Sequence, residues 1–177
     1  MPVGGEPPAP LIDGQTLARA AWDAVTIPQP SVETNPKVTT GDGVSGATVV
    51  GLDTWVWATG ETPARVMATA TAGAVTATVT AVSDGLNLSA PDSAPDCHGF
   101  GIPWTQGAAE GSSNCTVEFT RSSAHLGGTT PLTVSVGYDV AWTATDGTSG
   151  TLDPITTTST TDLPVAEIQT INRDTNH

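Results

Sequence analysis

The sequence is short of basic residues and contains a single lysine, Lys37. Five Lys and Arg side chains stand against eighteen Asp and Glu, which gives a formal net charge of −13. Because contacts to phosphate groups need Lys or Arg, this balance disfavours binding to nucleic acid and to anionic membranes. We therefore expect no nucleic-acid partner.

Long apolar runs are also missing, and the short apolar runs of the chain could not span a bilayer. We therefore expect no membrane insertion. The first residues, MPVGGE, lack the basic and apolar regions of a signal peptide. Either the protein remains in the cytosol or an export signal is not part of this sequence.

Aromatic residues are scarce at 5% of the chain, yet five of them are Trp. A few large side chains must therefore anchor a core that is otherwise built from Val and Ala. The 177 residues suffice for one domain with a full core. We expect a flexible leader at 1–12, a short helix and Pro-rich connector at 13–30, one domain at 31–171, and a flexible tail at 172–177.

Apolar and polar residues alternate over residues 132–145, and the apolar positions are Leu132, Val134, Val136, Tyr138, Val140 and Trp142. A helix would scatter these side chains around its axis, so the alternation predicts a long central strand with one buried face. Such a strand must cover its apolar face with another layer, and a second sheet is the usual solution. The pattern predicts an all-β domain.

The remaining segments extend this interpretation. Residues 16–25 have helical spacing, with Asp13 or Thr16 as the N-cap and prolines 28 and 30 beyond the end. Strands are predicted at 31–37 (an edge strand), 47–59 (either buried on both sides or bent at Gly51), 64–72 and 74–82 (a hairpin), 115–121 and 151–161, whereas 84–111 is predicted to be irregular. About eight strands of this spacing are typical of an immunoglobulin-like β-sandwich.

Cys97 and Cys115 are the two cysteines of the chain. Two free thiols are common in cytosolic proteins. We expect a disulfide instead, because Cys97 ends a Pro- and Asp-rich segment that offers few apolar contacts, and a bridge to the start of a strand would constrain it. A disulfide in turn predicts an oxidising, exported setting.

The motifs VVGLDTWVW, CHGFGIPW, CTVEFTRSSA and YDVAWTATDGTSGTL, followed by VAEIQ, occur in this order. In this respect the chain resembles secreted proteins of high-GC Gram-positive bacteria that carry an immunoglobulin-like domain of the polycystic-kidney-disease (PKD) type. It departs from them at Asp53, where proline is usual, and at residues 81–86, where only Asp84-Gly85 remains of a W-x-x-G-D-G turn. The resemblance implies a secreted or surface module without assigned catalysis.

Metal and cofactor sites are not evident. Asp84, Asp92 and Asp96 are the calcium candidates, because hard cations take several oxygen ligands from loops. No D-x-D-x-D-G series is present, however, and acidic residues commonly solvate turns. A zinc site from Cys97, His98 and Cys115 lacks a well-spaced fourth ligand and competes with the disulfide. We predict no cofactor.

Catalytic motifs are missing as well. Ser122, Ser123 and His125 could supply a nucleophile and a base, but there is no G-x-S-x-G elbow. Glu118 and Asp139 could form a carboxylate pair, although both fall on predicted outer strand faces. A hydrolase or carbohydrate-binding accessory domain is therefore an alternative, and we predict that the protein is not an enzyme.

Phe100, Ile102 and Trp104 lie on the loop that the cysteines would close. Apolar side chains on a loop of a rigid scaffold can anchor a partner, although Trp104 could instead fold back as a lid on the core. We predict a structural or protein-interaction module whose partner is a protein or a component of the cell envelope. A virion or appendage protein is a further alternative, and the sequence leaves the oligomeric state open.

Overall fold

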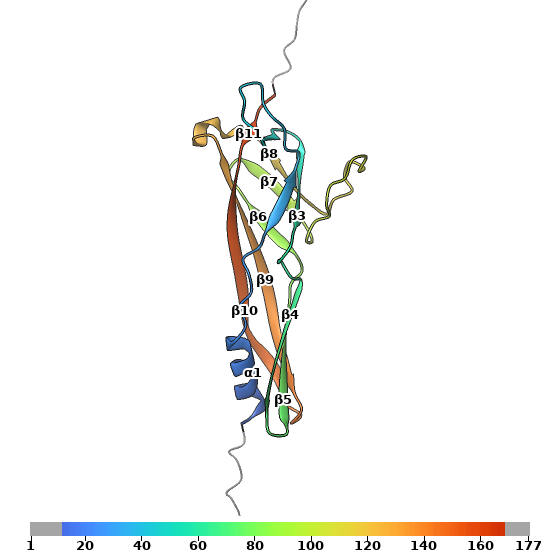
Figure 1. The fold of residues 1–177 in the computed structure, drawn as a ribbon. Helices are drawn as coiled ribbons and strands as arrows, with labels where there is room; N and C mark the ends of the chain where they lie inside the picture. Colours follow the sequence, from blue (N-terminus) through green and yellow to red (C-terminus); the bar gives the residue numbers. More distant parts are fainter. Residues whose placement is uncertain (1–11, 169–177) are drawn as a thin grey trace, which may run out of the picture. The chain divides into compact units, whose positions relative to one another are not determined.

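The computed structural model describes residues 12–168, which are mostly strand (Figure 1). The elements are α1 (Gly14–Asp23), β1 (Val32–Asn35), β2 (Thr48–Val49), β3 (Asp53–Ala58), β4 (Arg65–Ala72), β5 (Val75–Val82), β6 (Leu86–Ser89), β7 (Ser93–Cys97), β8 (Cys115–Phe119), the 3-10 helix η1 (Ser123–Leu126), β9 (Thr130–Ala144), β10 (Ser149–Leu163) and β11 (Val165–Ala166). The prediction of an all-β protein with one short N-terminal helix is confirmed. The predicted tail lies outside the described residues, as does the predicted leader except Ile12.

Contacts within the chain group it into two compact units. The first contains residues 12–27, 65–83 and 138–155, and the second contains residues 28–64, 84–137 and 156–168. Strands β9 and β10 contribute residues to both units.

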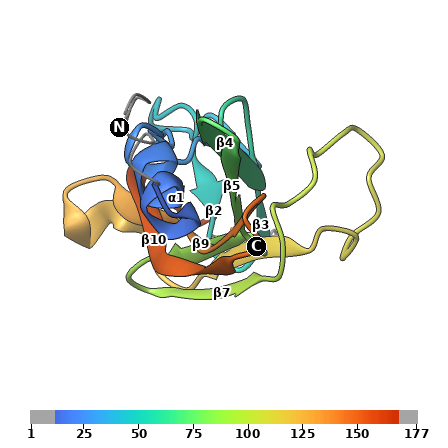
Figure 2. The same ribbon diagram turned by 90° about the horizontal axis from the view of Figure 1, so that it is seen from below.

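The first unit consists of α1 and a sheet in the order β10-β9-β5-β4 (Figure 2). Ala77, Val79 and Ala81 of β5 are fully buried, and α1 packs on β4 and β5. The predicted β4–β5 hairpin is confirmed, and it closes near Gly73, whose φ is +62°. Apolar side chains from one face of the helix and one face of the strands thus build this core.

Helix α1 begins two residues earlier than predicted. Asp13 is the N-cap, and its carboxylate accepts a hydrogen bond from the Thr16 amide (2.7 Å). Gly14 and Ala18 are buried together with Leu17 and Ala21, whereas Ala20 and Ala24 are exposed. Gly14 lies so close to the β9–β10 turn that a Cβ atom would come within 2.4 Å of the Thr148 hydroxyl.

The second unit contains a four-stranded antiparallel sheet, β1-β3-β8-β7, together with β6 and the adjoining parts of β9 and β10. In the β1-β3-β8-β7 sheet, the side chains of Val56, Val117 and Phe119 are fully buried. On β9, those of Leu132, Val134 and Val136 are fully buried. Strands β2 and β11 form a short parallel pair. As predicted, β1 is an edge strand, and the chain bends at Gly51 (φ +84°), which separates β2 from β3.

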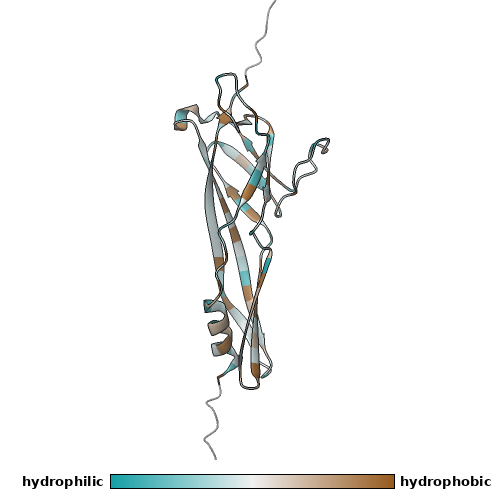
Figure 3. Ribbon diagram, viewed as in Figure 1, coloured by the Kyte–Doolittle hydropathy of each residue, from teal (hydrophilic) through white to brown (hydrophobic). Residues whose placement is uncertain are grey.

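Strand β9 is central, as predicted, because β10 lies on one side of it and β5 and β6 pair along the other. Its six predicted inward residues are all buried, and Figure 3 shows the apolar bands that recur along it. The prediction of an irregular segment at 84–111 is wrong in part, since β6 and β7 lie within it. Both strands are short, at four and five residues, and they are held by their pairing with β9 and β8. Strand β6 also buries Leu86 in the core, whereas β7 is largely exposed.

The register of β9 can be tested with two aspartate substitutions. Val136 is fully buried, whereas Thr133, on the opposite face, is partly exposed. Val136→Asp should destabilise the protein by about 3 kcal/mol or more, because it buries an unpaired charge and removes core contacts. Thr133→Asp should change stability far less in urea unfolding. Equal losses from the two variants would refute the assignment of the faces.

The hydroxyl of Thr130 offers a second test. Thr130 is 1% exposed, and its Oγ1 has no hydrogen-bond partner among residues 12–168. Thr130→Val should therefore raise the free energy of unfolding by about 1 kcal/mol, since it removes an unpaired buried polar group at nearly constant shape. The matched control is Thr54→Val, which should destabilise the protein because the Thr54 hydroxyl bonds the buried Thr48 hydroxyl (2.6 Å). Destabilisation by both variants would contradict the prediction.

Asp146 should make the first unit sensitive to acid. Its carboxylate accepts hydrogen bonds from the Gly14 amide (3.1 Å) and from the amide (3.0 Å) and hydroxyl of Thr148. The bond from the Thr148 hydroxyl is the largest of the causes that lower the pKa of Asp146 below its usual 3.8. A lowered pKa stabilises the folded protein above pH 3.8, and this contribution is lost as the pH falls through the folded-state pKa.

Asp146→Asn should accordingly lower the melting temperature at neutral pH, and the difference from the unmodified protein should shrink as the pH falls below 3.8. Asp153→Asn, at an exposed position of β10, is the control and should have little effect at either pH. A difference that stays constant down to low pH would show that the carboxylate charge is not responsible.

Candidate functional site

A disulfide joins Cys97 at the end of β7 to Cys115 at the start of β8. The two residues are register partners in the antiparallel β7–β8 pair, and the pairing continues beyond them through the bond from the His98 amide to the Asn114 carbonyl (2.8 Å). The predicted bridge is confirmed. A crosslink with a sequence separation of 18 residues stabilises a fold by about 3 kcal/mol.

The loop 98–114 is fixed where it leaves the sheet. The Gly99 carbonyl accepts a hydrogen bond from the Leu86 amide (2.9 Å), and the Phe100 carbonyl accepts one from the Ala58 amide (2.8 Å). Gly101 has a φ of +77°, and a Cβ atom at this position would lie 2.1 Å from the Val56 carbonyl oxygen. The stem of the loop is thus held against β3 and β6 by backbone contacts that side chains would obstruct.

Beyond this stem the loop extends away from the strands, as Figure 2 shows. The side chain of Ile102 is 40% exposed and that of Trp104 is 39% exposed, whereas Phe100 is half-buried. Trp104 is therefore partly exposed to solvent. Ile102 and Trp104 are thus two exposed apolar side chains on a loop whose base is closed by the disulfide.

The metal candidates do not converge. Asp84 is exposed between β5 and β6, the carboxylate of Asp92 contacts His125 (2.8 Å), and that of Asp96 contacts His98 (2.7 Å). Within residues 12–168, no three His, Cys, Asp or Glu side chains form a group that could hold a metal ion. The zinc interpretation also fails, because both cysteines are consumed by the disulfide.

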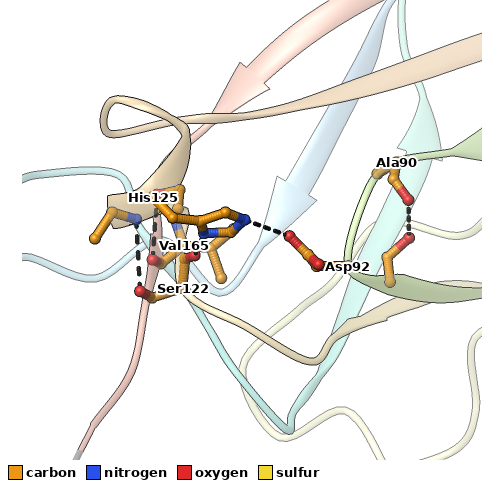
Figure 4. Close-up of polar contacts among 8 residues, drawn as sticks. Ala90, Asp92, Ser122, His125 and Val165 are labelled. Atoms are coloured by element: carbon orange, nitrogen blue, oxygen red, sulfur yellow. Dashed lines mark hydrogen bonds and ion pairs between the residues drawn. The ribbon is translucent and has the colours of Figure 1, made fainter.

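The serine and histidine candidates gather at η1 (Figure 4). His125 Nδ1 lies 2.9 Å from the Ser122 carbonyl oxygen, and Nε2 lies 2.8 Å from the Asp92 carboxylate. Both ring nitrogens therefore face oxygen acceptors, and neither is directed at a serine hydroxyl. The sequence analysis named Asp92 as a calcium candidate, and no sequence signal indicated its contact with His125.

Ser123 is 3% exposed and has a structural role. Its hydroxyl donates to the Gly128 carbonyl (2.8 Å) or the Val165 carbonyl (3.2 Å), and it accepts a hydrogen bond from the Val165 amide (2.9 Å). These bonds attach η1 to β11. Glu118 and Asp139, the candidate carboxylate pair, are both exposed, on β8 and β9 respectively.

The structure also contains a groove that the sequence did not indicate. It has a volume of about 750 Å³ and is bounded by residues of the segments 38–47, 122–128 and 164–168, all in the second unit. The three segments are far apart in the sequence, so no local motif marks the groove.

No helix within residues 12–168 is long and apolar enough to cross a lipid bilayer. Comparison of the chain with protein-family models, curated proteins and solved structures found no match.

Proposed function

We propose that this protein is a secreted or surface-exposed, non-catalytic module that binds a protein or a cell-envelope component. In this proposal its fold is an immunoglobulin-like β-sandwich of the PKD type. The observation that carries the proposal is the pair of exposed apolar side chains, Ile102 and Trp104, on the disulfide-closed loop.

The disulfide supports export. Disulfides persist in oxidising compartments and are rare in proteins of a reducing cytosol. The bridge joins two neighbouring strands and closes the base of the 98–114 loop, so reduction would free the base of the loop that presents the two apolar side chains.

The loop has the features of a recognition element. Exposed Trp and Ile side chains bury a large apolar area when a partner covers them, and Trp is enriched among the residues that dominate binding energy. The fixed stem at Gly99 and Gly101 lowers the entropy that is lost on binding, because the base of the loop is already held in place.

The occupied nitrogens of His125 support a non-catalytic role. A general base for a serine nucleophile needs one imidazole nitrogen free to accept the hydroxyl proton. Here Nδ1 and Nε2 are both engaged, by the Ser122 carbonyl and by Asp92. The nearby Ser123 hydroxyl is in turn engaged by the backbone of Val165 and Gly128.

The test is a binding measurement with cell envelopes isolated from a high-GC Gram-positive bacterium. The protein should co-sediment with the envelopes, and Trp104→Ala should weaken binding by about tenfold or more, as expected for a dominant contact residue. Leu126→Ala is the matched control, because Leu126 is also 40% exposed but lies on η1. Protease treatment of the envelopes distinguishes a protein partner from a glycan. Equal binding of Trp104→Ala and the unmodified protein would refute the role of the loop.

A further inference from the structure

The groove beside η1 has fixed walls. Val38 and Ala47 exchange two backbone hydrogen bonds (2.8 and 2.9 Å), and the Thr40 amide donates to the Val44 carbonyl (2.8 Å). On the opposite side, Ser123 bonds the backbone of Val165. The groove is therefore formed before any ligand arrives, and its volume of about 750 Å³ lies in the range of ligand-binding pockets.

The surface of the groove is largely apolar. Val38, Val44, Ala47, Val165 and Ile168 are among the residues that line it. Val44 is 41% exposed and Ile168 is 66% exposed, so apolar area that water now covers would be buried by an occupant. An occupant must therefore supply apolar groups.

The charges that line the groove have one sign. Asp42 in the 38–47 segment and Glu167 after β11 carry carboxylates, and none of the lining residues is Lys, Arg or His. The neighbouring Lys37 is engaged by Glu33 (2.7 Å). A hydrogen bond from the Thr40 hydroxyl lowers the pKa of Asp42, which keeps this carboxylate charged in mild acid.

We propose that the groove binds a short segment of a partner protein in which apolar side chains alternate with Lys or Arg. This rests on the proposed function as an interaction module and adds a second contact surface to it. The two carboxylates come from separate segments of the chain, so the occupant needs positive charge at more than one point beside its apolar groups. An extended peptide meets this requirement, because it carries Lys or Arg at every second position along its length, while the apolar side chains between them point to the other side.

The experiment uses the full chain and short synthetic peptides observed by two-dimensional NMR and calorimetry. A peptide of alternating leucine and lysine should bind and shift the amide signals of segments 38–47, 122–128 and 164–168. Peptides that alternate leucine with glutamate, or serine with lysine, should bind at least about tenfold more weakly, because each lacks one of the two complementary features. Raising the salt concentration should weaken binding of the leucine–lysine peptide.

Variants assign the effect to the groove. The double variant Asp42→Asn, Glu167→Gln should lose about tenfold in affinity and much of the salt dependence. Glu61→Gln, Glu110→Gln removes two exposed carboxylates that do not line the groove and should bind like the unmodified protein, apart from a small long-range effect. Ala124→Trp, at an exposed lining position, should block binding sterically and leave the melting temperature near that of the unmodified protein.

Three results would overturn the inference: no shift of the groove signals, equal binding of the leucine–glutamate peptide, or binding of a simple cationic detergent as tight as that of the peptide. Trp104→Ala separates this inference from the proposed function. The variant should bind the leucine–lysine peptide with unchanged affinity. If the peptide shifted the amide signals of loop 98–114 and not those of the groove, the groove proposal would be refuted and the proposed role of the loop would stand.

Discussion

The inward side chains of β9 are buried without interruption, from Leu132 at 0% exposed to Trp142 at 5%. Both units depend on this one alternation. In the first unit the register places Trp142 opposite Val79 and Val140 opposite Ala81, and in the second it places Val136 opposite Leu86. A shift of one residue would turn every one of these side chains to the solvent. The apolar face of β9 therefore fixes which residues of β5 and β6 form the two cores.

Few large apolar side chains lie in the loops. Polar and covalent links hold the loops instead of apolar packing. The disulfide closes the 98–114 loop, Ser123 attaches η1 to β11, and Asp146 joins the start of α1 to the β9–β10 turn. Each link satisfies backbone groups or restricts the chain without adding to the core. Because most of them pair a side chain with the backbone of a distant segment, they form only once the strands are in register.

The two surfaces proposed for binding differ in their chemistry. Loop 98–114 exposes Ile102 and Trp104 and carries a single carboxylate, Glu110, so its contacts depend on shape and desolvation. The groove combines apolar walls with Asp42 and Glu167, so its contacts also depend on charge and on salt. A net charge of −13 favours the approach of basic partners, and the groove carries two of the carboxylates beside apolar walls.

Much of this protein follows from local patterns. Alternation alone predicted β9, β8 and the β4–β5 hairpin, and Asp13 was named as a cap for α1. The Cys97–Cys115 bridge was predictable because the chain has only two cysteines and because Cys115 falls on the inward side of a strand. Strands β6 and β7 were not predictable, because segments of four and five residues are too short to show a clear alternation and become strands only when a neighbouring strand supplies their hydrogen bonds. The contact between His125 and Asp92, and the groove built from three separate segments, were decided by tertiary structure, because each requires residues that no local pattern brings together.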